Sequence, residues 1–83
     1  MKNTEASQLI RVLLQAKSEA AMLDLLEGLL TPSELTEIAR RLQIVKLLKA
    51  GVSQREIAEK LAVGIATVTR GSREIKQGRF ANL

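Results

Sequence analysis

The side chains best suited to chemistry gather in the last third of the sequence, on two predicted helices. Gln54 and Arg55 stand at the start of the first helix, and Thr67, Thr69 and Arg70 lie on the second. Amide, hydroxyl and guanidinium groups in such places bind the phosphates and base edges of nucleic acids. The absence of histidine and cysteine excludes a nucleophile paired with a histidine base, a disulfide and the usual zinc sites. With no carboxylate pair beside a glycine-rich pocket either, the sequence predicts a binding protein that requires no cofactor, not an enzyme.

Positive charge is concentrated in the same region. The 83 residues carry a net charge of +4. Residues 53–83 hold six Lys or Arg and three Glu, whereas residues 1–52 hold seven Lys or Arg and six Asp or Glu. A basic end on a small helical chain favours a polyanionic partner, nucleic acid before membrane, although a mildly basic soluble surface accounts for the charge alone equally well. No apolar run approaches the roughly 20 residues of a membrane span, and the N-terminus lacks a signal-peptide pattern. We therefore expect a cytoplasmic protein without a membrane partner.

Two helices and a tight turn must position these side chains. Ser53–Glu56 is a capping box that starts the first helix, Ala62–Gly64 forms the turn, and the second helix runs from near Ile65 to near Gly78. Alanine at the first turn position costs about 1 kcal/mol, because that position favours glycine. Ala58 is small where the helices cross, and the inward-facing apolar residues are Ile57, Leu61, Val68 and Ile75. This pattern is typical of a helix-turn-helix; the alternative is a helical hairpin with a solvated charged face.

The preceding residues predict three more helices. Residues 1–30 indicate two of them, and Thr31–Glu34 is a second capping box that starts a third, ending at Gly51. The third helix is expected to bury a face with steps of three and four residues, formed by Leu35, Ile38, Leu42, Val45 and Leu48. Residues 79–83 are expected to form a frayed tail.

A second copy of the chain is the most direct way to complete the core. A chain of this length buries only about 60–65% of the surface that its unfolded form exposes. With 46% hydrophobic and 1% aromatic residues, its core must be aliphatic. One apolar set is wider than the stripe of a surface helix: Met22, Leu23, Leu25, Leu26, Leu29 and Leu30. Its width favours a dimer core built from both chains over a short buried hairpin.

Three runs of residues resemble the Trp repressor family. Ser53–Glu56 is followed, at residues 64–72, by Gly-Ile-Ala-Thr-Val-Thr-Arg-Gly-Ser, and Leu30–Pro32 looks like the segment that precedes them in the family. The resemblance covers residues 29–76. Part of the third helix, residues 41–48, looks closer to a related branch whose effector is unassigned.

The resemblance implies an all-α, five-helix chain with a helix-turn-helix, assembled as an intertwined homodimer. It implies a single domain, residues 1–83. Within that domain, residues 1–52 are the dimerisation helices, residues 53–76 the helix-turn-helix and residues 77–83 a tail. Each helix-turn-helix would read one half of a palindromic operator in double-stranded DNA.

The family's functional positions carry over onto matching residues here. Those matching DNA contacts are Gln54, Arg55, Gly64, Ile65, Ala66, Thr69 and Lys76. We expect Ile65, Ala66 and Thr69 to face base edges and the remaining side chains to hold phosphates. Those matching the ligand pocket are Thr31, Arg41, Thr67, Arg70 and Gly71, with two arginines flanking a planar ring and Gly71 leaving room beneath it.

Three departures from the tryptophan-responsive members bear on these roles. Ala58 replaces a lysine that contacts DNA, and Glu74 replaces a serine that meets the ligand amine. The stretch from Arg41 to Ser53 is one residue shorter. Glu74 lies one helical turn after Arg70, so it either pairs with a ligand amine or neutralises Arg70 and closes the pocket.

The sequence thus predicts a homodimeric transcriptional regulator, a repressor that acts by occupying its operator. The resemblance implies a small-molecule corepressor, with tryptophan or a related compound as the first candidate. Two other functions remain open: an effector-independent DNA-binding protein of the related branch, and a helical dimer whose basic end binds an acidic protein. Steep salt dependence combined with a sequence preference would distinguish DNA binding from the last of these.

Overall fold

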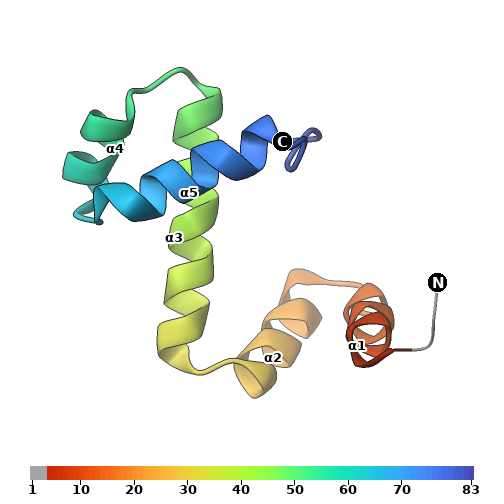
Figure 1. Ribbon diagram of the computed structural model, residues 1–83. Coiled ribbons are helices and arrows are strands. Elements are labelled where there is room, and N and C mark those ends of the chain that lie inside the picture. Colours follow the sequence, from red (N-terminus) through yellow and green to blue (C-terminus); the bar gives the residue numbers. More distant parts are fainter. Residues whose placement is uncertain (1–3) are drawn as a thin grey trace. The chain divides into compact units, whose positions relative to one another are not determined.

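Five α-helices and no strand make up the part of the chain that the structure, a computed structural model, describes, residues 4–83 (Figure 1). The helices are α1 (Glu5–Leu14), α2 (Glu19–Leu29), α3 (Pro32–Lys49), α4 (Gln54–Leu61) and α5 (Ile65–Lys76). This confirms the predicted all-α, five-helix fold. The chain divides into two compact units on either side of the bond between Leu35 and Thr36. The division into dimerisation helices, helix-turn-helix and tail remains a prediction.

The first unit contains α1, α2 and the start of α3. Side-chain caps start both of the first two helices: Thr4 Oγ1 accepts a hydrogen bond from the Ser7 amide, and Ser18 Oγ accepts one from the Ala21 amide, each at 3.1 Å. No residue of α2 is buried in the single chain. Several large apolar side chains on these two helices are exposed, and the exposed fraction is largest, 76%, for Leu14. The others are Leu9, Ile10, Val12, Leu23 and Leu29. A single copy therefore does not form the buried hairpin considered as an alternative.

A reciprocal capping box starts α3, as the sequence predicts. The Thr31 amide donates to Glu34 Oε1 at 2.8 Å, and the Glu34 amide donates to Thr31 Oγ1 at 3.1 Å. Two of the amides that a helix start leaves without partners are satisfied in this way. Pro32 occupies the first helical position, where its missing N–H costs nothing.

The second unit is built around three fully buried side chains from three helices. Ile44 of α3, Ile57 of α4 and Val68 of α5 are each at most 1% exposed. Around this cluster pack the partly buried side chains Leu47, Leu48, Val52, Ala58, Leu61 and Val63. Figure 1 shows α5 crossing the C-terminal half of α3. Of the expected inward positions, Ile57 and Val68 are fully buried, and Leu61 is partly buried against this cluster. Ile75 is also only half-buried, and it is not among the residues that pack on the cluster.

The predicted buried face of α3 is wrong in part. Val45 is buried as expected, but Ile44 belongs to the core and was not on the predicted face, while Ile38 and Leu42 are 47% and 39% exposed. The reason is that α4 and α5 pack against the C-terminal half of the helix, so two successive residues are enclosed there. A single face with steps of three and four residues assumes cover along the whole helix.

The α4–turn–α5 segment has the predicted bounds. Ser53 Oγ accepts from the Glu56 amide at 3.2 Å, and the Glu56 carboxylate lies 3.3 Å from that hydroxyl instead of reaching the Ser53 amide. Only half of the predicted capping box therefore forms. Ala62 has the left-handed φ of 54°, and the Val63 amide donates to the Ala58 carbonyl at 3.0 Å, which closes the end of α4. The expected cost of alanine at this position, about 1 kcal/mol, follows from that conformation.

Residues 77–83 form a C-terminal turn, so the prediction of a frayed tail at residues 79–83 is wrong. Gly78 reverses the chain with a φ of 96°, and the Arg79 amide then donates to the Glu74 carbonyl at 3.1 Å. Lys49 Nζ donates to the carbonyl of Phe80, which ties the turn to the end of α3. These contacts hold Phe80 in a left-handed conformation, φ 62°, that non-glycine residues seldom adopt.

None of the helices within residues 4–83 is both long enough and apolar enough to cross a membrane.

Candidate functional site

The residues expected to contact DNA lie at the starts of α4 and α5 and along α5. Gln54 and Arg55 are the first two residues of α4, and Gly64 is the N-cap of α5, followed by Ile65 and Ala66. Farther along α5 lie Thr69 and Lys76. Ile65 is 53% exposed at the start of α5. The Ile65 side chain is therefore accessible to a partner.

Gly64 has no role inside the chain that explains the absence of a side chain. Its φ of −69° is open to any residue, and a Cβ added there would meet no heavy atom within 4 Å. Neither backbone strain nor internal packing therefore requires glycine. Close approach of another molecule to the start of α5 does require a small residue at this position.

One hydrogen bond joins the start of α4 to α5. The Thr69 hydroxyl lies 2.8 Å from Gln54 Oε1 and 3.0 Å from the Ile65 carbonyl oxygen. A hydroxyl has a single hydrogen, and both acceptors belong to this chain. The hydrogen is thus used inside the protein, which leaves the γ-methyl and the oxygen lone pair for an outside partner.

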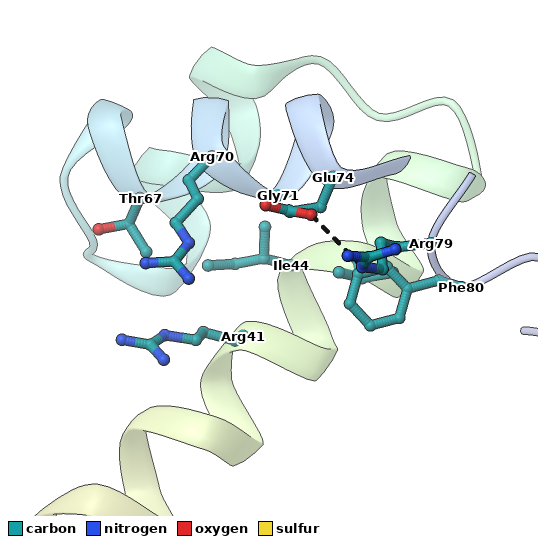
Figure 2. Close-up of a pocket in the computed structure, with 9 residues that line it drawn as sticks. Arg41, Ile44, Thr67, Arg70, Gly71, Glu74, Arg79 and Phe80 are labelled. Carbon is teal, nitrogen blue, oxygen red and sulfur yellow. Dashed lines mark ion pairs between the residues drawn. The ribbon is translucent and has the colours of Figure 1, made fainter. Parts of the chain in front are cut away.

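A pocket of about 370 Å³ opens between α3, α5 and the C-terminal turn (Figure 2). Its lining comes from three segments: Arg41, Ile44 and Val45 of α3, Thr67, Arg70, Gly71 and Glu74 of α5, and Arg79 and Phe80 of the turn. Five of the six residues assigned to a ligand pocket from the sequence are therefore brought together. The sixth, Thr31, belongs to the first unit and is not a lining residue.

The inner wall of the pocket is apolar, because Ile44 and Val45 are buried there. Gly71 lets α5 approach this wall closely: a Cβ added to it would lie 3.3 Å from Ile44 Cγ2 and 3.4 Å from Leu48 Cδ1. Both separations are at or below the lower end of ordinary carbon contacts. Glycine at this position therefore serves the packing of α5 on α3, in addition to any room that it leaves for a ligand.

The charged side chains divide the rim of the pocket into two ends. At one end the guanidinium groups of Arg41 and Arg70 extend into the same space (Figure 2), and neither makes a hydrogen bond or ion pair with any residue that the structure describes. At the other end Glu74 Oε2 lies 3.8 Å from Arg79 Nε. The free guanidinium pair can bind a carboxylate or stack on a planar ring.

The sequence predicts either a ligand amine or Arg70 as the partner of Glu74. In the structure the partner is Arg79, which was not predicted from the sequence. Phe80, Ile44 and Val45 were also missed as pocket residues. A usable signal was Gly78 directly after a helix, because glycine there lets the chain turn back and place the next residues beside the helix. Within residues 4–83 no cluster of three acidic side chains that could hold a metal ion is found.

Comparisons with known proteins bear on these assignments. The family described as Trp repressor protein matches residues 4–81. The Trp operon repressor homolog of Vibrio vulnificus (strain YJ016) is 53% identical over 53 residues, which is 63% of this chain and 52% of the relative. The matched stretch thus spans about half the length of that relative.

Two further relatives are matched over most of this chain. The Trp operon repressor homolog of Vibrio cholerae (serotype O1) is 42% identical and that of Photobacterium profundum 43%, each over 74 residues, 88% of this chain and 72% of the relative. No solved structure matches. On the extent of these matches, the chain belongs to the Trp repressor family.

Proposed function

We propose that this chain is a sequence-specific DNA-binding transcriptional regulator that acts as a homodimer and represses by occupying its operator. In this proposal α4, the turn and α5 form a helix-turn-helix. The start of α5 enters the major groove, and α4 lies across the phosphates. Membership of the Trp repressor family and the names of the relatives support the proposal.

The observation that carries the proposal is the surface shared by the starts of α4 and α5. It combines an exposed apolar side chain, Ile65, with a glycine that the chain itself does not need, Gly64. The hydrogen bond from Thr69 to Gln54 fixes the two helix starts relative to one another. Arg55 and the free amides at the start of α4 suit phosphate, whereas Ile65, Ala66 and Thr69 suit base edges.

A second copy of the chain would cover apolar surface that one copy leaves exposed. In the first unit this surface is formed by α1 and α2, and in the second by Ile38 and Leu42 of α3. Exposure of aliphatic side chains is costly in water, so cover by a second copy would stabilise each unit. A dimer would also supply the two helix-turn-helix units that a palindromic operator requires.

The pocket supports a small-molecule effector, with tryptophan as the first candidate. Its volume lies within the range of about 300–1,000 Å³ that is usual for small-ligand sites. The unpaired Arg41 and Arg70 would hold a carboxylate and flank a ring, over the apolar wall of Ile44 and Val45. Because α5 supplies both pocket residues and DNA-facing residues, ligand binding would favour the α5 position that fits DNA.

Selection from a random DNA library tests this function. The purified full chain is incubated with the library, with and without tryptophan, and the retained sequences are read. The proposal predicts enrichment of a palindrome with half-sites separated by about one helical turn, 10–10.5 base pairs, and stronger retention with tryptophan. Equal enrichment without tryptophan would identify an effector-independent DNA-binding protein. Retention without any sequence preference would contradict the proposed transcriptional regulator. It would favour the alternative, in which the basic surface binds an acidic protein.

A further inference from the structure

Glu74 has two arginines within reach and pairs with the one that is farther along the chain. Arg70 precedes Glu74 by four residues on α5, a spacing that places oppositely charged side chains side by side on a helix. The ion pair nevertheless joins Glu74 to Arg79, as the dashed line in Figure 2 shows. Arg70 is left with its guanidinium free beside that of Arg41.

The backbone, and not only the ion pair, places Arg79 beside Glu74. Gly78 reverses the chain after α5, and the Arg79 amide donates to the carbonyl of Glu74 itself. On the far side of Arg79, the Phe80 carbonyl accepts from Lys49 of α3. Two hydrogen bonds, one from the Arg79 amide and one from the Lys49 side chain to the next residue, thus hold the backbone around Arg79 in place, so less of the chain must be ordered for its side chain to reach the Glu74 carboxylate.

We propose that Arg79 is a positioning residue that keeps the pocket competent for an anionic ligand by holding Glu74 away from Arg70. The ligand class is a small planar carboxylate, and the inference rests on the proposed ligand site between Arg41 and Arg70. With Glu74 neutralised by Arg79, the two free guanidiniums leave an excess positive charge at their end of the pocket. Without Arg79, Glu74 turns to Arg70, cancels its charge and competes with the carboxylate of the ligand.

The size of this effect follows from the exposure of the groups. The Arg79 side chain is 68% and the Glu74 side chain 33% exposed, so this ion pair is weak. Arg70 is exposed as well, so an ion pair between Glu74 and Arg70 would also be weak. A change of partner is therefore easily caused by one substitution. We expect tryptophan affinity to fall about 2- to 5-fold in Arg79→Ala, which is the range that exposed ion pairs supply.

The first experiment is a cycle of four proteins titrated with tryptophan by calorimetry: the wild type, Arg79→Ala, Glu74→Gln and the double variant. The proposal predicts that Arg79→Ala weakens binding only when Glu74 is present. Glu74→Gln and the double variant should both bind at least as tightly as the wild type. Equal weakening by Arg79→Ala in both backgrounds would mean that Arg79 contacts the ligand directly, and it would overturn the positioning role.

A second measurement, without any ligand, separates this inference from the proposed ligand site. Two-dimensional ¹⁵N spectra at mildly acidic pH report each arginine Nε–Hε group, and the Arg70 signal is assigned with Arg70→Lys. In Arg79→Ala that signal should shift, and in the double variant with Glu74→Gln it should return to its wild-type position. Arg73→Ala, which removes an arginine of α5 outside the pocket, is the matched control and should leave it unchanged.

The outcomes distinguish the two failures. If the Arg70 signal shifts as predicted but the wild type gives no heat with tryptophan, Arg79 positions Glu74 and tryptophan is not the ligand. An Arg70 signal that is unaffected by Arg79→Ala overturns the inference whether or not tryptophan binds. Circular dichroism and melting curves of all four proteins ensure that each comparison is made between folded chains.

Discussion

The two units of the chain differ in how much of their apolar surface they bury. The second unit encloses Ile44, Ile57 and Val68 completely, with one side chain from each of three helices. The first unit caps its helices well but leaves leucines on α1 and α2 largely exposed, and no residue of α2 is buried. Local hydrogen bonding therefore forms helices in both units, whereas only the second closes a core from its own residues.

This difference supports the proposal that the two units have separate tasks. A closed core holds the starts of α4 and α5 and the pocket rim in fixed geometry, which a binding site needs. An exposed apolar face becomes buried only when another molecule packs against it. A second copy of the chain is suited to this because it presents the same apolar face. On this account the first unit joins two copies, and the second unit presents the sites.

The largest effect is expected from a charge placed on the open face. Leu26→Glu puts a carboxylate among the leucines of α2 and should abolish both association and cooperative folding, because an unpaired charge is costly to bury. Glu27→Gln, a polar change on the same helix, is the control and should retain both. Sedimentation equilibrium with thermal unfolding provides the measurement. A folded, cooperatively unfolding monomer of Leu26→Glu at micromolar concentration would show that the first unit needs no partner.

A cavity in the closed core should cost less than the loss of the partner. Ile57→Ala removes a fully buried side chain, so the free energy of unfolding should fall by about 2–5 kcal/mol. Ile38→Ala, at a position that is half exposed in the single chain, should still be costly, because the proposed second copy covers Ile38. Urea denaturation at two protein concentrations measures both. A loss for Ile38→Ala as large as that for Ile57→Ala would place Ile38 inside the dimer interface.

Alanine substitution at one helical glycine in each unit compares how closely the helices of the two units are packed. In Gly71→Ala the new Cβ would lie 3.3 Å from Ile44 Cγ2 and 3.4 Å from Leu48 Cδ1, so these side chains must move by a few tenths of an ångström. Because Ile44 is enclosed in the core, we expect this cost to exceed the helix-propensity gain of about 1 kcal/mol. In Gly28→Ala the Cβ meets no atom of the chain, and only the gain remains. Melting curves should therefore move in opposite directions. The same sign for both variants would mean that α5 and α3 are not held as closely as described.

The smallest effect concerns the Thr69 side chain. Because its hydroxyl hydrogen is used within the chain, we expect its γ-methyl to contact DNA, where the methyl group of thymine is a suitable partner. Thr69→Ser keeps the hydroxyl and should lower discrimination at one base pair by about 1 kcal/mol. Thr69→Val keeps a methyl in its place and should retain more of that discrimination. Competition binding with selected and singly mutated sites gives the values, and the reverse order would assign the readout to the hydroxyl.

The local features of the fold were predictable because short stretches of sequence determine them. Ser53, the Ala62–Gly64 turn and the Thr31–Glu34 box fix helix ends through contacts three to five residues apart. The buried face of α3 was not predictable in the same way, because Ile44 is enclosed by residues more than ten positions away. The C-terminal turn depends on a bond between Lys49 and Phe80, 31 residues apart.

The candidate site was predictable to a different degree in its two parts. The capping residues and the length of the turn predict where the helices that begin with Gln54 and Ile65 start. The side chains exposed at these helix starts were therefore predictable. The pocket residues Arg41 and Arg70 came from the family resemblance, because nothing in their spacing places them together. Arg79 and Phe80 required the course of the chain after Gly78; the glycine signals a reversal of the chain, but it does not tell which residues the reversed segment meets.

The salt dependence of DNA binding tests the central assignment, that the start of α4 holds phosphate and the start of α5 reads bases. The slope of log affinity against log salt concentration is measured on a selected site and on a scrambled site, for the wild type, Arg55→Ala and the control Lys17→Ala. Arg55→Ala should weaken both sites about equally and reduce the slope by about 1, and Lys17→Ala should change neither. An unchanged slope in Arg55→Ala, or equal affinity of the wild type for both sites, would contradict the account.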